Sequence, residues 1–376
     1  MATINISLVG GQPMPVFALI LDQEPDQIFL VHSEQTKALA ERLKDNIKRK
    51  LPKTAIVLQE LEVGLQDADR NIRAFAQAWC PAGSEVTVNL SGGTKPWSLL
   101  FYRHFSQQDN AKCVFIDQNN VVWNMKTLEN HKANLDKLQL DDIFSLNSVR
   151  ITSKTNLNDY TPKDRSDCKR IEQLYLTNWS AMWKMTNQLA DMGGRGRAAN
   201  GKSEIWYDYE ENAYVCKVVS ANGNKENNLT LRSPHNADML LSTGWFETKV
   251  ALFLERWKMA KQIWLNVHFG SGSTNNDQNE VDIIIETTAG KLLFVECKTK
   301  VHNITDINKF NDVVRNNGGQ GSKKVFITRD PMTGDAKVKA EQVGMPHYAL
   351  NTISQPANEP VFFDWLSDYM SDINEK

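Results

Sequence analysis

Short apolar runs alternate with amphipathic stretches over the N-terminal third of the chain. The apolar runs are rich in β-branched residues, which favour strands. They are Ile4–Val9, Ile28–Val31, Ala55–Leu58, Val86–Leu90, Val114–Ile116 and Val121–Trp123. Apolar residues recur at helical spacing in Thr36–Lys50, Asp67–Trp79 and Lys95–Phe105, which predicts helices between the strands. Strands that alternate with helices predict a mainly parallel sheet covered by helices on both faces.

The pattern changes after about residue 145. Arg170–Leu189 keeps helical spacing throughout, which predicts one long helix. A polar, glycine-rich stretch breaks the chain after it, and the apolar runs Ile205–Tyr209 and Ala213–Val219 then flank a Glu-Glu-Asn turn, which predicts a hairpin. We expect residues 146–237 to connect a first domain over 1–145 to a second domain over 238–376.

The last segment begins with a helix and continues as strands. An apolar stripe predicts a helix over Gly244–Ala260 and a second helix is predicted over Asp306–Asn316. The predicted strands are Ile263–Phe269, Val281–Glu286, Leu292–Lys298 and Lys324–Thr328. The two ends of the chain therefore both read as α/β domains.

Composition places the chain among globular proteins of ordinary charge. Of 376 residues, 41% are hydrophobic and 23% are charged, a composition that excludes bulk disorder. The pattern shows neither a membrane span nor a signal peptide, so we expect a cytoplasmic protein. The net charge of -2 provides no global attraction for nucleic acid, so any such contact must come from local patches.

The five cysteines are scattered without a C-x-x-C pair, which argues against a zinc site and against a disulfide framework. They are Cys80, Cys113, Cys168, Cys216 and Cys297. We expect reduced thiols that are mostly buried.

The stretch NEVDIIIETTAGKLLFVECKTK carries the most specific chemistry. It predicts two strands joined by a short turn. Glu296 and Lys298 lie two residues apart and share one face of their strand, whereas Cys297 points away. If Thr287–Lys291 form the connection, Asp282 on the first strand lies directly opposite Glu296.

Two carboxylates that meet in this way repel each other unless a cation lies between them. Mg²⁺ or Mn²⁺ bound by carboxylates, with open positions for water and a phosphate oxygen, is common machinery for phosphodiester hydrolysis. Lys298 then stabilises charge that develops on phosphorus. The alternative is a surface salt bridge on an exposed hairpin. The E-x-K triplet alone is weak evidence, because Glu247-Thr248-Lys249 is a second copy, but the apolar flanks disfavour an exposed hairpin.

This arrangement resembles the PD-(D/E)XK nuclease superfamily and its restriction-endonuclease-like α/β fold. Asp282, Glu296 and Lys298 match the motif one by one, and the resemblance implies that they are catalytic. Glu247, on the preceding helix, matches the accessory acidic residue of many members. The resemblance also implies a metal held by Asp282, Glu296 and the backbone carbonyl of Cys297.

A glycine pair follows an apolar strand near residue 90 and opens a helix. In NLSGGTKPW, Gly92 and Gly93 allow a tight turn, Thr94 caps the helix and Lys95 adds a charge. This pattern is typical of an anion site at a helix N-terminus, and it lacks the spacing of a Walker A loop. Gly10–Gln12 form a second loop after a strand. Each loop taken alone also fits an ordinary strand-to-helix turn.

Both features together resemble the CRISPR-associated Rossmann-fold (CARF) ancillary nucleases of type III systems. The resemblance implies a homodimer that binds one cyclic oligoadenylate, most commonly cyclic tetra-adenylate, and then cleaves single-stranded RNA, DNA or duplex DNA with Mn²⁺ or Mg²⁺. The implied ligand-binding residues are Gly10, Gly11, Gln12, Ser91, Gly92, Gly93, Thr94 and Lys95. His32 is a weaker candidate, with a structural role as its alternative.

Two other functions fit parts of the pattern. One is a nucleotide-sensing regulator without catalysis, and the other is an ungated repair or restriction nuclease whose first domain is structural. The intact Asp282, Glu296 and Lys298 favour catalysis over the first alternative.

In the nuclease interpretation we also expect Lys323 and Lys324 to lie near the cleft and to steer a phosphate backbone. The preference for RNA or DNA, the ring size and any degradation of the ligand stay open.

Overall fold

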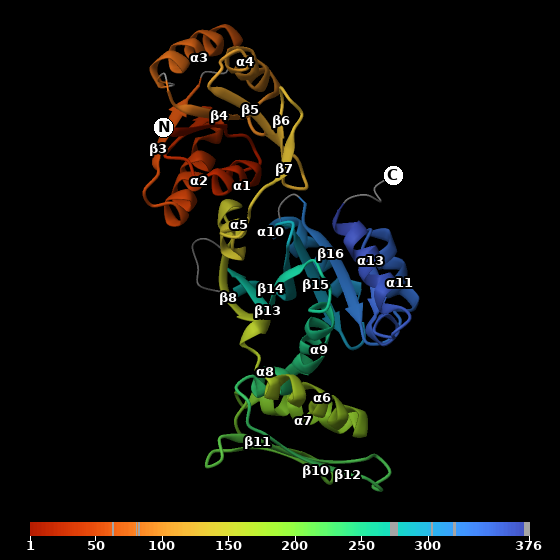
Figure 1. The fold of residues 1–376 in the computed structure, drawn as a ribbon. Helices are drawn as coiled ribbons and strands as arrows, with labels where there is room; N and C mark the ends of the chain where they lie inside the picture. The colour runs from red at the N-terminus through yellow and green to blue at the C-terminus, as the bar shows by residue number, and fades with distance from the viewer. Residues whose placement is uncertain are drawn as a thin grey trace. The chain divides into compact units, whose positions relative to one another are not determined.

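The computed structural model describes residues 1–61, 64–79, 81, 83–270, 277–301, 304–318 and 321–371. The chain forms two compact units, the first built on Met1–Ile151 and the second on Thr152–Phe269 and the segments that follow (Figure 1). Most of the expected connector therefore lies within the second unit. Among the described residues, no helix combines the length and apolarity needed to cross a bilayer.

The first unit is built on a seven-stranded sheet with the order β3-β2-β1-β4-β5-β6-β7. The strands are β1 (Thr3–Leu8), β2 (Gln27–His32), β3 (Ala55–Glu60), β4 (Glu85–Asn89), β5 (Ala111–Ile116), β6 (Val121–Asn124) and β7 (Asn130–Lys132). Strands β1 to β5 pair in parallel, whereas β6 and β7 pair antiparallel. The predicted strands and the mainly parallel sheet are confirmed, and β7 is an addition.

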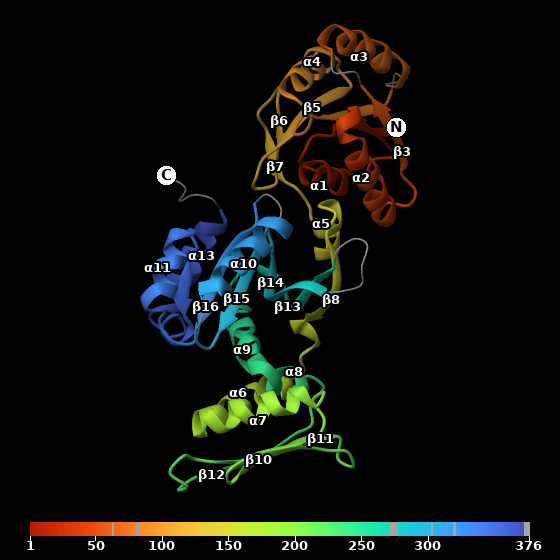
Figure 2. The same ribbon diagram turned by 180° about the vertical axis from the view of Figure 1, so that it is seen from behind.

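Helices cover both faces of this sheet, as Figures 1 and 2 show. They are α1 (Met14–Gln23), α2 (Lys37–Lys50), α3 (Leu65–Trp79), α4 (Lys95–Phe105) and α5 (Leu140–Leu146). The side chains of α3 and α4 pack with those of β1, β2 and β4 in one apolar core. Helix α1 was not predicted because its sequence is apolar nearly all round, which hides the amphipathic period.

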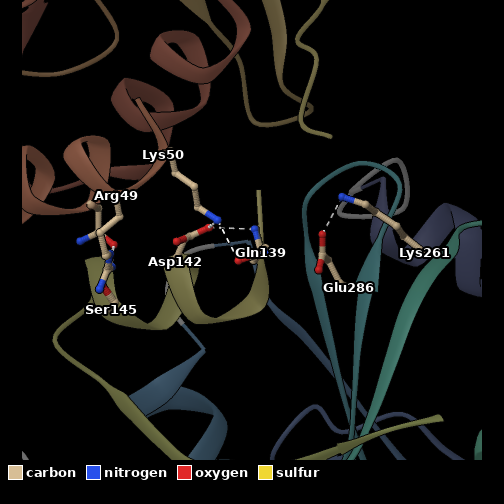
Figure 3. Close-up of polar contacts among 8 residues, drawn as sticks. Arg49, Lys50, Gln139, Asp142, Ser145, Lys261 and Glu286 are labelled. Atoms are coloured by element: carbon tan, nitrogen blue, oxygen red, sulfur yellow. Dashed lines mark hydrogen bonds and ion pairs between the residues drawn. The ribbon is translucent and has the colours of Figure 1, made fainter. Parts of the chain in front are cut away.

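Polar contacts fasten α5 to α2 (Figure 3). Lys50 Nζ lies 2.8 Å from Asp142 Oδ2 and donates a hydrogen bond of 2.8 Å to Gln139 Oε1. Arg49 donates to Ser145 Oγ at 3.0 Å. Asp142 is nearly inaccessible to solvent, so its ion pair with Lys50 fixes α5 against α2.

The second unit begins with two helices and a small sheet. The helices are α6 (Pro162–Thr177) and α7 (Trp179–Asp191), so the prediction of one long helix over Arg170–Leu189 is wrong. Asn178 has φ -155° and ψ 89°, outside the helical region. Its side-chain oxygen accepts a 3.1 Å hydrogen bond from Ala181 N, and this cap starts a new helix within an unbroken apolar period.

A four-stranded antiparallel sheet follows, with the order β12-β11-β10-β9. Its strands are β9 (Arg197–Asn200), β10 (Ser203–Asp208), β11 (Ala213–Val219) and β12 (Glu226–Leu231). The predicted hairpin is confirmed as β10–β11. One face of this sheet contributes to the same apolar core as α6 and α7, which lie along it in Figures 1 and 2.

The main sheet of the second unit has six strands in the order β17-β16-β15-β14-β13-β8. They are β8 (Arg150–Asn156), β13 (Ala260–Gly270), β14 (Asp277–Thr287), β15 (Leu292–Lys298), β16 (Lys323–Thr328) and β17 (His347–Ala349). Strand β15 pairs antiparallel with β14 and parallel with β16. The helices are α8 (Asn236–Leu240), α9 (Gly244–Leu254), α10 (Ile304–Asn317), α11 (Gly334–Gln342), α12 (Leu350–Ile353) and α13 (Glu359–Met370).

The helix expected over Gly244–Ala260 is too long by one and a half turns. Helix α9 ends at Leu254, and Ala260 already begins β13. Trp257 continues the apolar stripe from a turn, is buried, and donates from Nε1 to Ser367 Oγ at 2.9 Å. The stripe therefore reflects burial beyond the end of the helix.

The cysteine prediction is confirmed for the described thiols. They are free and buried: Cys113, Cys168, Cys216 and Cys297. Burial raises the pKa of Cys113 to about 11 and that of Cys216 to about 12. Cys80 lies outside the described residues.

Candidate functional site

The hairpin β14–β15 has the register that the sequence predicts. Glu286 pairs with Leu292, so counting back along both strands places Asp282 opposite Glu296. Near the turn of the hairpin, the buried Glu286 forms an ion pair in which Lys261 Nζ lies 2.9 Å from Glu286 Oε1 (Figure 3). This ion pair lies at the end of the hairpin opposite to Asp282 and Glu296.

Two carboxylates and an ammonium meet at the other end of these strands. Lys298 Nζ lies 2.7 Å from Glu296 Oε1 and 3.6 Å from Asp282 Oδ2. Asp282 Oδ2 also accepts a 2.7 Å hydrogen bond from the backbone N–H of Cys297. The side chain of Asp282 is 9% exposed, that of Glu296 12% and that of Lys298 33%. A surface salt bridge on an exposed hairpin therefore does not describe this site.

Burial and mutual repulsion disfavour the charged carboxylates. Burial, followed by the charge of Asp282, raises the pKa of Glu296 to about 7. Burial also raises the pKa of Asp282. Burial opposes the charged form of Lys298, but Asp282 and Glu296 outweigh it and raise the pKa of Lys298. The ammonium is one compensating charge for two carboxylates, so an additional cation would be favourable here.

The donor set fits a hard divalent cation only if the backbone contributes. The described residues contain no group of three or more His, Cys, Asp and Glu side chains placed to hold a metal ion. In a strand, the N–H and C=O of one residue point to the same side. The Cys297 N–H points to Asp282, so its carbonyl also lies on the β14 side. Asp282, Glu296 and this carbonyl suit Mg²⁺ or Mn²⁺, with water and phosphate oxygens completing the shell.

Glu247 on α9 belongs to the same electrostatic cluster. Burial, followed by the charge of Asp282, raises the pKa of Glu247 well above its usual range. Glu247 also lines a cleft of about 400 Å³, together with residues of β8, β13 and β14 such as Thr155, His268 and Glu280. The second E-x-K triplet is therefore divided: Glu247 belongs to the cluster, whereas Lys249 forms a 2.6 Å ion pair with Glu172 on α6.

The two glycine loops of the first unit meet backbone to backbone. They follow the neighbouring strands β1 and β4, which pair in parallel. A Cβ atom on Gly10 would lie 2.6 Å from the backbone nitrogen of Gly93, and one on Gly92 would lie 1.9 Å from the carbonyl oxygen of Leu8. Gly93 also has a φ of 72°, in the left-handed region. The sequence needs glycine here because no other residue allows this approach.

Of the residues around these glycines, some face solvent and some support the loop. Gly11, Gln12, Thr94 and Lys95 are exposed. Thr94 caps α4 through its side-chain oxygen. The hydroxyl of Ser91 accepts a 2.8 Å hydrogen bond from Ile116 N, which makes Ser91 a support of the neighbouring strand end.

His32 is buried and its Nδ1 lies 3.0 Å from the carbonyl oxygen of Ser33, which favours the structural alternative.

The sequence pattern did not single out the polar residues of β1 and β4, the strands that precede the glycine loops. Asn5, Ser7 and Asn89 interrupt apolar strands and are fully buried. Asn89 Oδ1 accepts a 3.0 Å hydrogen bond from Ser91 N. The sequence does carry a signal for them, because a polar residue within an apolar, buried strand requires a hydrogen-bond partner.

The expectation for Lys323 and Lys324 is wrong. In the parallel register Lys324 pairs with Phe294, whereas Thr328 pairs with Lys298. Glu296 pairs with Phe326, so Lys324 and Lys323 lie two and three residues before the position of β16 that faces Glu296. Lys324 Nζ donates to an amide oxygen on α10, and Lys323 lies over an aromatic ring of α13 at 5.1 Å. Gly319 and Gln320 of the preceding loop lie outside the described residues.

The mainly parallel sheet with helices on both faces gives the first unit a Rossmann-like fold. Residues 4–143 match the family model of the Card1 CARF domain. The CARF resemblance drawn from the glycine loops is thereby confirmed. A comparison with curated proteins finds no match.

Solved structures share the fold over nearly the whole chain. Can2 from Sulfobacillus thermosulfidooxidans, in complex with cyclic tetra-adenylate, has a TM-score of 0.66 at 16% identity, covering 98% of this chain and 99% of that chain. Protein VC1899 from Vibrio cholerae has a TM-score of 0.72 at 14% identity, covering 96% and 97%. A type III CRISPR defence DNA nuclease activated by cyclic oligoadenylate has a TM-score of 0.57 at 16% identity, covering 89% and 47%.

Proposed function

We propose that this chain is a metal-dependent nuclease of type III CRISPR antiviral defence that a cyclic oligoadenylate activates. One observation carries the proposal: a CARF domain and a buried Asp282–Glu296–Lys298 cluster occur on one chain. The similar structures include one bound to cyclic tetra-adenylate and a nuclease activated by cyclic oligoadenylate, which supports this activator and this reaction.

The activator site we propose is built on Gly10–Gln12 and Gly92–Lys95. Gly11, Gln12, Thr94 and Lys95 are exposed, so their backbone N–H groups and the Lys95 ammonium offer donors to the phosphates of a ring. A ring with an even number of nucleotides can carry two-fold symmetry, so two copies of the chain would present identical loops to its two halves. We therefore propose a homodimer that binds one cyclic tetra-adenylate.

In the nuclease site, Asp282, Glu296 and the carbonyl of Cys297 would hold Mn²⁺ or Mg²⁺. Such an ion supplies Lewis-acid polarisation of a phosphate oxygen and a more acidic bound water. Lys298 Nζ lies 2.7 Å from Glu296 Oε1. From there its ammonium would hold the attacking water and stabilise the charge that builds up on the phosphate. The oxygen of water bonds to phosphorus and the bond to the leaving ester oxygen breaks. One proton of the water passes to the leaving oxygen, which becomes an alcohol, and the other is released to solvent. Glu247 increases the negative potential that retains the cation.

The test is cleavage of labelled single-stranded and double-stranded RNA and DNA with Mn²⁺ or Mg²⁺, with and without cyclic tetra-adenylate. We expect no cleavage without activator, cleavage with it, and loss of cleavage when EDTA removes the metal. Binding without cleavage of any substrate would instead support a non-catalytic sensor. Equal cleavage with and without activator would support an ungated nuclease.

A further inference from the structure

A second cavity lies in the second unit at the carboxyl ends of β15 and β16. Its volume is about 280 Å³, and the loops after these two parallel strands line it. Thr299 and Lys300 come from the loop after β15, and Thr328 and Arg329 come from the end of β16. The carboxyl ends of parallel strands are where open α/β sheets receive ligands.

The cavity is adjacent to the nuclease residues through the backbone. Lys298 pairs with Thr328 across β15 and β16, and neighbouring strands lie about 4.8 Å apart. Arg329 N donates a 3.2 Å hydrogen bond to the carbonyl oxygen of Lys298. Glu296, two residues before Lys298, belongs to the carboxylate cluster, whereas Lys300, two residues after it, lines the cavity.

The Arg329 guanidinium is fixed before any ligand arrives. It lies over the ring of Trp179 with 4.4 Å to the centroid. Its Nε donates to Asp330 Oδ2 at 2.8 Å, and Asn351 Nδ2 donates to the other oxygen of Asp330 at 2.9 Å. A guanidinium that is stacked and clamped loses little freedom on binding an anion.

The lining chemistry suits a phosphate diester. Asp330 offsets one of the two positive charges, so the exposed Lys300 leaves the lining positive. The hydroxyl groups of Thr299 and Thr333 add neutral donors to the wall. Among the described residues, no aromatic side chain lines the cavity to stack a base. A phosphate backbone, which carries no sequence information, is therefore the ligand that the lining fits.

We propose that Lys300 and Arg329 bind the phosphate backbone of the nucleic-acid substrate next to the phosphodiester bond that is cleaved beside Lys298. This inference rests on the proposed function and adds the subsite that holds the strand. A contact to phosphate alone acts equally on RNA and DNA of any sequence. It raises the dependence of binding on salt, because each neutralised phosphate releases counterions.

The experiment compares wild type with Lys300→Ala, Lys300→Arg and Lys337→Ala. Lys337 is an exposed lysine on α11 that does not line the cavity, so it controls for loss of a charge. Binding of a fluorescein-labelled single-stranded oligonucleotide is followed by anisotropy over a salt series, and kcat and KM are measured with saturating activator and Mn²⁺.

We expect Lys300→Ala to weaken oligonucleotide binding and to raise KM about tenfold, the loss of one charge-assisted contact. The slope of log affinity against log salt should fall by about 0.7, the value for one phosphate on a single strand. Lys300→Arg should restore both, kcat should stay within about threefold, and Lys337→Ala should match wild type.

An unchanged salt slope in Lys300→Ala, or an equal change in Lys337→Ala, would overturn this inference while leaving the nuclease assignment intact. A wild-type protein that binds the oligonucleotide but does not cleave it would refute the proposed function, and the salt slope would still decide the role of Lys300. A wild-type protein that binds no oligonucleotide would overturn the inference directly.

Discussion

The two candidate sites differ in what carries their chemistry: side chains in one and backbone groups in the other. The hairpin β14–β15 carries its chemistry in side chains, because Asp282, Glu296 and Lys298 converge from buried strands. The loops after β1 and β4 carry theirs in the backbone, because Gly10 and Gly92 bring main chains into contact. The first kind of site fails when atoms are removed, and the second fails when atoms are added. Mutations of matched size should therefore separate the two sites.

The largest effect is expected from Glu296→Gln. The substitution keeps the shape of the side chain and removes one of two carboxylates that would hold the metal. Cleavage should fall at least about 10³-fold, comparable to the loss of a principal electrostatic contact, whereas activator binding should be unchanged. Rates are measured at saturating activator, with Glu341→Gln on α11 as a surface control. Cleavage near the wild-type rate would remove the nuclease assignment.

The backbone site is tested by a pair of identical substitutions. A Cβ on Gly92 would lie 1.9 Å from the Leu8 carbonyl oxygen, whereas a Cβ on Gly11 meets nothing within 4 Å. Gly92→Ala should cost about 1–3 kcal/mol of unfolding free energy through overpacking and should abolish activation. Gly11→Ala should leave the unfolding free energy unchanged within about 0.5 kcal/mol.

Urea unfolding and activator titration measure both quantities for this pair. If Gly11→Ala weakens activator binding without loss of stability, Gly11 lines the ligand as proposed. Equal stability of the Gly92 and Gly11 variants would contradict the close approach of the two loops.

Lys95→Ala should have an intermediate effect, on activation alone. Its ammonium is exposed beside the glycine loop, and a charge-assisted contact to phosphate contributes about 1.5–3 kcal/mol. The activator concentration for half-maximal cleavage should rise about 10–150-fold, with the maximal rate retained. Lys112→Ala is the control, since Lys112 lies near the start of β5 and pairs with Glu85. An activator requirement equal to wild type would place the ligand elsewhere.

The smallest effect is expected from Cys297→Ala, between Glu296 and Lys298, the two residues of β15 that we propose to be catalytic. The thiol is buried in the apolar core of the second unit, and only the carbonyl of this residue is proposed to bind metal. Cleavage should stay within about threefold, and unfolding free energy should fall by about 1 kcal/mol through a small cavity. A loss of cleavage without loss of stability would assign the thiol a role in the site.

These contrasts also explain what the sequence could predict. A site made from alternating side chains on a short hairpin follows from strand periodicity and loop length, so the register of Asp282 and Glu296 was predictable. Contacts between distant segments were not. The stacking of Arg329 on Trp179 joins a strand end to a helix start that lie far apart in sequence.

Apolar periodicity was reliable for the existence of elements and poor at their ends. It missed the break at Asn178 because a side-chain cap interrupts the backbone without interrupting the stripe. The nuclease interpretation placed Lys323 and Lys324 near the site from their position beside a predicted strand, and this position does not say which residues of the strand face the site. The buried Asn89 and the half-buried Ser91 make hydrogen bonds whose partners only the fold identifies.

The central claim is that ligand binding in one unit controls chemistry in the other. Its most direct test is a titration of cleavage with cyclic tetra-adenylate at a chain concentration far above the dissociation constant, in the presence of Mn²⁺. We predict no cleavage at zero activator and a linear rise that breaks at one ring for two chains, because a two-fold ring would be shared by a dimer. Full cleavage without activator, or a break at one ring per chain, would contradict the account.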